Sequence, residues 1–345
     1  MDRAWQMREK HEIAGVGDMS RSGRQAGHAL ARSAVGGGAV SAAQPSQASL
    51  ERDLRGYGGN PPPTPWPVGT KAVVSIAVHL EEGAELSISD GDATGEQNCE
   101  GMLIEEGHRE FAVESFFEYG ARCGVWRLLR IFSTFGVKAT FFCCGRSLSR
   151  NPLLGRRLVE LGHEVACHGW RYLPYHGFSD SDQRREIESS RNAVREHCGV
   201  EPVGWVSRVP TLSTREQLVR VGGFTYDCDG YADDLPYWAG TAAGPMLVVP
   251  NTFDNSDEKF WPLPNNSGFT NPANFLNSMS DSLGWLLTEA GAVARILPVA
   301  LRPRISGRPS KAEQIHQFLA SATAQAGVRF MTRGEIAKLW TEKAP

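Results

Sequence analysis

The chain has 345 residues, of which 41% are hydrophobic and 22% are charged, and a formal net charge of −3. It is long enough to bury a sizeable core in one large domain or two ordinary ones. The small net charge gives no electrostatic case for binding nucleic acid or an anionic membrane surface, and no apolar run approaches the length of a transmembrane helix. No two of the seven cysteines have the spacing of a C-x-x-C zinc motif, and Cys143 and Cys144 lie in an apolar run. We therefore expect reduced, buried thiols and a cytoplasmic protein.

Residues 1–51 differ in composition from the rest of the chain. Gly, Ala, Ser, Arg and Gln dominate them, and a stretch such as GGGAVSAAQPSQAS has too few large apolar residues to form a core. The segment also lacks the continuous apolar stretch of a secretory signal. We expect a disordered N-terminal arm over residues 1–51 and one folded domain over residues 52–345.

The first element predicted in the folded part is a strand within residues 72–83 that ends on two acids. Residues 72–78 are a short apolar, β-branched run between prolines and a glycine, which favours a buried strand over a helix. Glu81 and Glu82 follow where the strand leaves the core. Side chains alternate along a strand, so His79 and Glu81 should face one side, and Leu80 and Glu82 the other.

Helices and strands mostly alternate along the remainder of the chain. Helical spacing of apolar residues predicts helices over residues 116–135, 151–161, 179–198, 214–221, 275–290, 311–326 and 334–340. Short apolar runs predict further strands over residues 138–145, 163–167, 203–206, 224–227, 246–249 and 296–301. This alternation is typical of parallel strands joined by crossover helices, and about seven such units favour a closed (β/α) barrel over an open sheet.

Ionisable residues follow many of the predicted strands. They are Glu81, Glu82, His168, Arg208, Asp227, Asp229, Arg302 and Arg304. The carboxyl ends of barrel strands meet on one face, where such enzymes place their chemistry. The pattern therefore predicts an active site at that face.

Several sequence blocks resemble one enzyme family. KATFFCCG, followed by N-P-x(9)-G-H-E-V-A-C-H-G-W, resembles the polysaccharide deacetylase (NodB-homology) family. Other blocks, such as GYGGNPPPTPWP, HLEEGAELSISDGDA and YDCDGYADDLPYW, are similar to its branch of cofactor-independent, PuuE-type allantoinases and peptidoglycan deacetylase-like proteins. The resemblance runs from about residue 52 to residue 340. It implies a deformed (β/α) barrel, often a tetramer, that hydrolyses C–N bonds in N-acetylated sugars, allantoin or cyclic imides.

The resemblance also implies site residues, and two of them bear on metal binding. The family's catalytic base and its metal-binding acid correspond to Glu81 and Glu82. Its first metal-binding histidine corresponds to His168, but Tyr172 stands at the second. Catalytic zinc needs three protein ligands and an open position, and tyrosine is a poor ligand at neutral pH. We therefore expect no metal and no other cofactor.

A further departure from the family concerns its general acid. The motif that ends in this histidine reads Leu301-Arg302 here, so the acid is absent. A guanidinium cannot act as a proton donor, but it can stabilise an oxyanion or bind a carboxylate. We predict Glu81, His168 and Arg302 as catalytic residues. By the resemblance and by position, the predicted substrate-binding residues are His79, Glu82, Tyr172, Arg208, Asp227, Asp229 and Arg304.

In the mechanism expected from these residues, Glu81 takes a proton from water or substrate while His168 and Arg302 face the developing negative charge. A base near neutral pH needs a raised pKa, and we expect Glu82 and partial burial to raise the pKa of Glu81. An imide or ureide nitrogen leaves more readily than an amide nitrogen, so these substrates suit a site without the acid.

Three functions stay open from the sequence. The leading one is hydrolysis of a C–N bond in a small cyclic amide, ureide or imide, because the lead-in PPPTPWP and the loop YADDLPYW (residues 231–238) resemble the small-substrate branch. That loop is either a packed surface loop or a substrate cover. The alternatives are a polysaccharide N-deacetylase and a non-hydrolytic relative, either a binding protein or a biosynthetic isomerase or cyclase. The expected partners are a small-molecule substrate and further copies of the chain.

Overall fold

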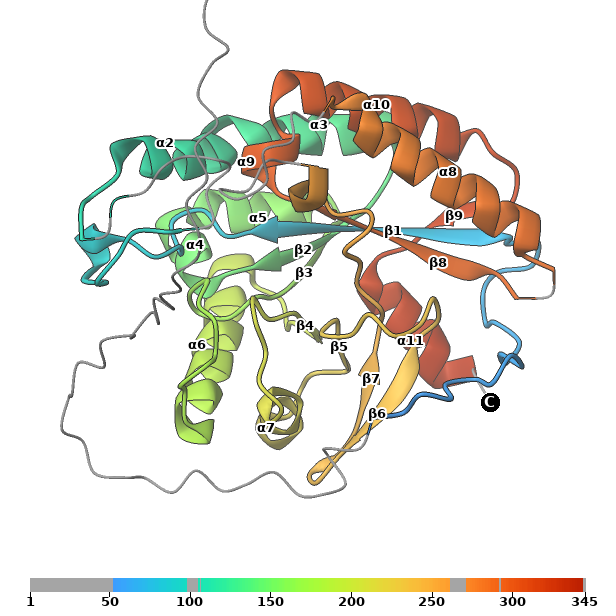
Figure 1. Cartoon of the computed structure of the whole chain (residues 1–345), viewed down its shortest axis with the longest axis horizontal. Coiled ribbons are helices and arrows are strands. Elements are labelled where there is room, and N and C mark those ends of the chain that lie inside the picture. The colour runs from blue at the N-terminus through green and yellow to red at the C-terminus, as the bar shows by residue number, and fades with distance from the viewer. Residues whose placement is uncertain (1–51, 98–104, 106, 261–270, 292, 344–345) are drawn as a thin grey trace, which may run out of the picture. The chain divides into compact units, whose positions relative to one another are not determined.

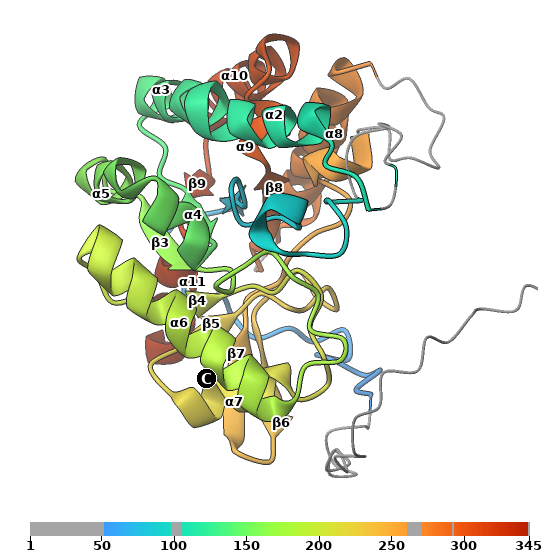
Figure 2. The same cartoon turned by 90° about the vertical axis from the view of Figure 1, so that its left-hand side faces the viewer.

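The computed structural model describes residues 52–97, 105, 107–260, 271–291 and 293–343. The expected N-terminal arm lies outside these residues. The described residues belong to one compact unit that spans Ala43–Pro345. Within them, nine strands form a single, mostly parallel sheet that curls into a half-barrel, with helices packed around it (Figures 1 and 2). This is the predicted deformed (β/α) barrel.

The strands run in the order β6-β7-β5-β4-β3-β2-β1-β8, and β9 pairs with β1. Their bounds are β1 Ala72–Leu80, β2 Thr140–Cys143, β3 Glu164–Cys167, β4 Gly204–Trp205, β5 Tyr226–Asp227, β6 Tyr237–Thr241, β7 Gly244–Val248, β8 Arg295–Leu301 and β9 Val328–Phe330. The helices are α2 Phe111–Tyr119, α3 Val125–Phe135, α4 Gly145–Arg150, α5 Pro152–Glu160, α6 Asp180–Cys198, α7 Thr214–Val221, α8 Ala273–Glu289, α9 Pro303–Ser306, α10 Pro309–Thr323 and α11 Arg333–Lys343. The 3₁₀ turns η1 Ile88–Asp90 and η3 Asp257–Phe260 and the π-turn η2 Gly120–Gly124 complete the described elements.

Each predicted strand is present, but some elements were missed. The antiparallel partner β6, the short strand β9 and the short helices α4 and α9 were not predicted. The single helix expected over residues 116–135 is two helices joined by the π-turn. In the described part of the chain, no helix is both long and apolar enough to cross a membrane.

Strand β1 is buried along its whole length and pairs with β8 on one side and with β2 and β9 on the other. Its alternate residues divide between two apolar clusters. Val74, Ile76, Val78 and Leu80 pack with the surrounding helices, whereas Val73 and Ala77 pack with residues that line the barrel interior. A strand that is covered on both faces has a nearly continuous run of apolar residues in its sequence, as β1 has. By the same alternation, His79 and Glu81 point into the barrel.

The two ends of the sheet, β6 and β8, do not pair with each other and are joined by irregular segments, which include an isolated β-bridge between Ser256 and Ala300. We call this join the seam. Along β8, the Ile296 N–H donates to Asp234 O at 3.1 Å and the Ala300 N–H donates to Asn255 O at 3.0 Å. Pro298, between them, has no N–H to donate, which is why it is tolerated on an edge. The seam holds the segment after Asn255 beside the carboxyl end of β8.

The π-turn η2 depends on a glycine at each end. A Cβ at Gly120 would overlap the carboxyl group of Glu82, and a Cβ at Gly124 would overlap the carbonyl of Pro303. The turn therefore touches both the end of β1 and α9, the short helix that follows β8. π-turns inserted in α-helices often mark functional sites.

Candidate functional site

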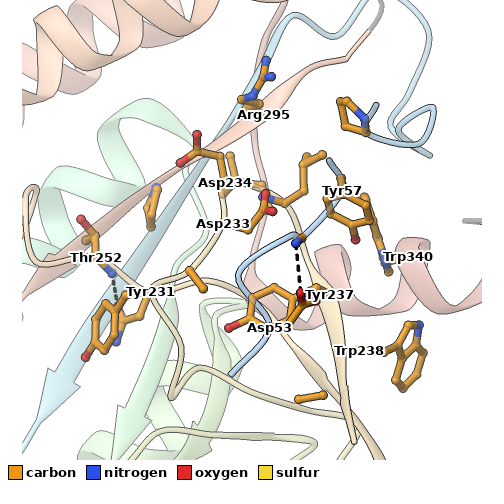
Figure 3. Close-up of a pocket in the computed structure, with 18 of the residues that line it drawn as sticks. Asp53, Tyr57, Tyr231, Asp233, Asp234, Tyr237, Trp238, Thr252, Arg295 and Trp340 are labelled. Atoms are coloured by element: carbon orange, nitrogen blue, oxygen red, sulfur yellow. Dashed lines mark hydrogen bonds between the residues drawn. The ribbon is translucent and has the colours of Figure 1, made fainter. Parts of the chain in front are cut away.

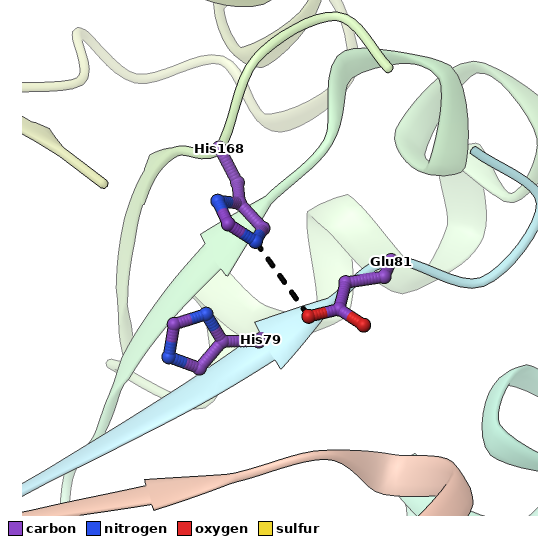
Figure 4. A group of neighbouring side chains, drawn as sticks. All are labelled: His79, Glu81 and His168. Atoms are coloured by element: carbon purple, nitrogen blue, oxygen red, sulfur yellow. Dashed lines mark ion pairs between the residues drawn. The ribbon is translucent and has the colours of Figure 1, made fainter. Parts of the chain in front are cut away.

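Glu81 lies at the centre of the candidate site. Its side chain, at the carboxyl end of β1, is 0% exposed. Its Oε2 accepts from Arg304 Nη1 at 2.5 Å, and its Oε1 lies 3.3 Å from Arg302 Nε and 3.6 Å from His168 Nε2. Figure 4 shows the Glu81 and His79 side chains on the same side of β1, with His168 facing them from the end of β3. The three residues predicted as catalytic are thus brought together.

The orientation of His168 defines which of its ring nitrogens is available. Its Nδ1 lies 2.8 Å from the carbonyl oxygen of Val206. A carbonyl can only accept, so Nδ1 carries a proton and the neutral ring has its lone pair on Nε2, the nitrogen that faces Glu81. The ring of His79 lies 5.1 Å from that of His168. Burial, reinforced by Arg302 and His168, lowers the pKa of His79 well below its ordinary value, so His79 is neutral.

Arg302 is held by carboxylates on several sides. Its Nη2 lies 2.8 Å from Glu258 Oε2, and its Nη1 lies 3.3 Å from Asp257 Oδ1. Its backbone N–H also donates to Asp257 Oδ2 at 2.6 Å. Burial lowers the pKa of Arg302, but Glu258 and Glu81 outweigh it and raise that pKa above its ordinary value. Arg302 therefore stays charged and cannot replace the missing acid.

The sequence analysis did not predict Asp257 or Glu258 as site residues. Both residues lie in η3, which follows an irregular segment instead of a predicted strand. The three predicted catalytic residues directly follow strands, whereas these two follow a loop. The seam places η3 beside β8, and nothing local in the sequence encodes the seam.

The charges of the two adjacent acids differ from the expectation. Burial would raise the pKa of Glu81, but Arg304 and Arg302 outweigh burial and hold this pKa well below its ordinary value. Burial, opposed by Arg304 and reinforced by Glu81, raises the pKa of Glu82 to about 8. The expected increase in the pKa of Glu81 is therefore wrong, because two arginines outweigh the neighbouring acid. Near neutral pH, Glu81 is ionised and Glu82 is mostly protonated.

Glu82 lies on the other side of β1 from Glu81, as the alternation predicted. With Leu80 and Glu85, it lines a cavity of about 420 Å³ between the end of β1, the α2–η2 segment and helices α4 and α5. Its Oε2 accepts from the backbone N–H of Glu81 at 3.1 Å. Glu82 therefore supports the position of Glu81 through the backbone.

Tyr172 and Arg208 lie beside His168. The ring of Tyr172 is 5.4 Å from the ring of His168, and burial raises the pKa of its phenol, which stays protonated. The guanidinium of Arg208 lies over the Tyr172 ring at 4.3 Å. Two nitrogens of Arg208 donate to Glu96, each at 2.7 Å. The predicted Arg208 is therefore paired with an acid that the sequence analysis did not single out.

Asp227 and Asp229 hold neighbouring loops. Asp227 accepts two hydrogen bonds from Arg215, at 2.7 and 3.0 Å. Asp229 accepts from the backbone N–H and from the hydroxyl of Ser207, each at 2.7 Å. Burial and the charge of Asp227 raise the pKa of Asp229 to about 6. The pair fixes the segment that leads from β4 to Arg208.

The family's metal-binding positions do not fit a metal ion here. Glu82 points away from His168, and Tyr172 keeps its proton. His79, Glu81 and His168 form a different group, with ligand atoms within 4.8 Å of one another. Both oxygens of Glu81, however, face an arginine, so a cation would meet two fixed positive charges. These donors fit zinc poorly.

A large cavity lies beside this cluster and does not contain it. It measures about 1760 Å³ and is lined by the lead-in from Arg52, by much of the loop over residues 231–238 and by residues 251–255 (Figure 3). Tyr231 stacks on Phe253 there, with ring centroids 3.9 Å apart. Glu81, His168 and Arg302 are not among its lining residues. Residues 251–255 run directly into Asp257 and Glu258, so this cavity borders the segment that holds Arg302.

Comparisons with known proteins indicate the family and agree with the fold. The family model described as polysaccharide deacetylase matches residues 106–223. A Schizosaccharomyces pombe protein whose name assigns it to the polysaccharide deacetylases is 32% identical over 85% of this chain and 98% of its own length. A crystal structure of a probable polysaccharide deacetylase from Pseudomonas aeruginosa has a TM-score of 0.79 at 35% identity, covering 85% of this chain and 98% of that one.

A crystal structure of PuuE allantoinase is similar to the same extent. Its TM-score is 0.80 at 34% identity, and the match covers 85% of this chain and 97% of that one. The chain therefore belongs to the polysaccharide deacetylase family, whose deacetylase and allantoinase members are hydrolases of carbon–nitrogen bonds other than peptide bonds.

Proposed function

We propose that the protein hydrolyses a C–N bond in a small cyclic amide, ureide or imide. One observation carries the proposal. Glu81 Oε1, His168 Nε2 and Arg302 Nε are all buried, face one another and have no hydrogen-bond partner among the described residues. A water molecule at this point accepts from Arg302 Nε and donates to Glu81 and His168, which satisfies all three groups. Such a water is the nucleophile that hydrolysis needs.

The charges of the site residues indicate which residue carries out each step of the hydrolysis. Glu81, with its lowered pKa, is a weak proton acceptor, so it orients the water, while the free Nε2 of His168 takes the proton. The water oxygen bonds to the carbonyl carbon, and the two guanidiniums stabilise the charge on the tetrahedral intermediate. His168, now protonated and stabilised by Glu81, gives the proton from Nε2 to the leaving nitrogen as the C–N bond breaks. One histidine thus acts as base and then as acid, and the missing family acid is not required.

Two observations favour a small substrate. The catalytic cluster is enclosed, since Glu81, His168 and Arg302 are 0%, 3% and 8% exposed. The similar PuuE protein is named an allantoinase, and allantoin is a small cyclic ureide. The second candidate, a polysaccharide N-deacetylase, is favoured by the names of the Schizosaccharomyces pombe and Pseudomonas aeruginosa relatives.

The test is to assay the purified protein on allantoin, hydantoin, succinimide and chitooligosaccharides. We expect turnover of at least one cyclic compound, and a loss of about 10²–10⁴ in kcat for His168→Asn, which keeps a similar size but has no base at Nε2. Hydrolysis of the chitooligosaccharides alone would favour the second candidate. An unchanged rate in His168→Asn would remove the proposed base.

Three further properties belong to this proposal. Activity needs no metal ion, because the donors at the site fit one poorly. The protein is cytoplasmic, which agrees with the free cysteines of the described residues, of which Cys143, Cys144, Cys167, Cys198 and Cys228 are buried. It forms a homo-oligomer, a tetramer by resemblance to its family, and sedimentation of the purified chain measures this directly.

A further inference from the structure

The geometry points to Glu258 as the residue that selects substrates carrying an N–H group beside the scissile carbonyl, an inference that rests on the proposed hydrolysis of cyclic ureides and imides. Glu258 lies in η3 and shares Arg302 with Glu81. Arg302 Nε faces Glu81 Oε1 at 3.3 Å, and Arg302 Nη2 faces Glu258 Oε2 at 2.8 Å. One rigid guanidinium therefore fixes the distance between the two carboxylates.

Glu258 has an acceptor that the protein does not use. Its Oε1 is buried, lies 3.7 Å from Arg304 Nη2 and makes no hydrogen bond within the described residues. A buried carboxylate oxygen with no donor is costly, so a ligand donor is favoured there. Carboxylates only accept hydrogen bonds, and the N–H groups of ureides and imides are donors.

Glu258 is the most exposed of the charged side chains around Arg302, although its Oε1 is itself buried. Its side chain is 25% exposed, whereas those of Glu81, Arg302, Arg304 and Asp257 are 9% exposed or less. Glu258 is therefore the most accessible charged group of this cluster. The proposal requires that a small ring with its carbonyl carbon between Glu81 and His168 turn its neighbouring N–H to Oε1 of Glu258, across the shared Arg302.

Asp257, the adjacent acid, provides a matched comparison. Its Oδ2 accepts from the Arg302 N–H at 2.6 Å and from the Ser306 hydroxyl at 2.8 Å, and its Oδ1 pairs with Arg302 Nη1. Both oxygens are used inside the protein. Asp257 thus supports Arg302 in the same way as Glu258 but has no free acceptor for a substrate.

The experiment compares hydantoin with its N-methylated forms, which lack one donor each. We expect the wild type to prefer hydantoin over at least one N-methyl form by a factor of about ten or more in kcat/KM, because an unmade hydrogen bond to a buried acceptor is costly. In Glu258→Ala the preference should fall to about threefold or less, through a loss on hydantoin. Asp257→Asn should lower kcat/KM on both compounds by the same factor.

The outcomes separate the two proposals. If the wild type turns over these compounds but Glu258→Ala loses activity on both by an equal factor, Glu258 is only a support for Arg302 and the inference is wrong. If the wild type hydrolyses no ureide or imide, the proposed function fails and the inference fails with it. Glu258→Gln, which keeps one carbonyl acceptor, should fall between the wild type and Glu258→Ala in its preference.

Discussion

Arg304 and Glu81 lie 223 positions apart in the sequence, yet Nη1 of Arg304 lies 2.5 Å from Oε2 of Glu81 inside the barrel. Their side chains are 1% and 0% exposed. Arg304 also lies over the ring of Phe117, at 4.4 Å, so α2 fixes it from the opposite side. This pair keeps Glu81 ionised while the acid next to it in the sequence keeps its proton.

Arg304→Met should destabilise the fold by about 3–5 kcal/mol, because it leaves a buried carboxylate without its main partner. The control is Arg109→Met. Arg109 pairs with Glu114 in two hydrogen bonds but is 52% exposed, and such surface pairs contribute about 1 kcal/mol or less. Urea unfolding at pH 7 measures both. Equal losses in the two variants would contradict the central role of the Arg304–Glu81 pair.

The Arg304–Glu81 pair should also make folding stability depend on pH. The folded-state pKa of Glu81 is depressed, so its stabilisation is present above its ordinary pKa of 4.5 and is lost as the pH falls toward the lower folded value. In Arg304→Met the folded-state pKa of Glu81 should rise toward its ordinary value. The loss of folding stability that Glu81 causes on acidification should therefore become smaller. Unfolding curves between pH 3 and pH 6 give the comparison. An identical pH slope in both proteins would mean that Arg304 does not set the charge of Glu81.

Glu82 should make the free energy of unfolding depend on pH in the opposite direction to Glu81. Its pKa is about 8 in the folded protein and 4.5 ordinarily, so the unfolded chain loses its proton first and stability falls as the pH rises from 4.5 to 8. The slope from one such group is at most about 1.4 kcal/mol per pH unit. Glu82→Gln should flatten it, whereas Glu160→Gln, at a side chain that is 60% exposed, should not. A slope unchanged by Glu82→Gln would refute the assignment.

Gly120→Ala should destabilise the protein by about 1–3 kcal/mol and lower kcat, because the new Cβ overlaps the carboxyl group of Glu82. Gly284→Ala in α8 is the control, since a Cβ there meets no atom within 4 Å and alanine favours a helix by about 1 kcal/mol. In a protein that already carries Glu82→Ala, the further substitution Gly120→Ala should cost less stability than it does in the wild type, because the overlapping carboxyl group is gone. Strictly additive effects of the two substitutions would rule out the proposed overlap.

Chelation should leave hydrolysis unchanged. The only acid of the His79–Glu81–His168 group in the described structure is paired with two arginines, which disfavours a divalent cation. The measurement is activity before and after dialysis against a chelator, together with the metal content of the protein. Zinc present in equal amount to the protein and lost together with activity would overturn this prediction.

The sequence was sufficient to find residues that follow predicted strands. Glu81, His168 and Arg302 come after β1, β3 and β8, and parallel strands bring their carboxyl ends together. The alternation along β1 also correctly separated Glu81 from Glu82, because it depends only on the backbone of one strand.

What escaped prediction depends on contacts between distant segments. The pKa of Glu81 was expected to respond to Glu82, its neighbour in sequence, but Arg302 and Arg304 decide it. Glu258 was overlooked because its place beside Arg302 comes from the seam and not from a strand. The unpredicted strand β9 is three residues long, too short for its alternation to be recognised.

The seam has a dynamic consequence for the site. Asn255 accepts from the Ala300 amide, and Asp257 and Glu258, which follow it after Ser256, pair with Arg302. A local opening of this join breaks few bonds, because Pro298 contributes no donor, so it costs less free energy than unfolding of the whole sheet. Asp257 also accepts directly from the Arg302 N–H and from the Ser306 hydroxyl, so the acids stay with the guanidinium unless these bonds open as well. Amide hydrogen exchange at Ala300 therefore measures how often the seam opens beside the catalytic centre.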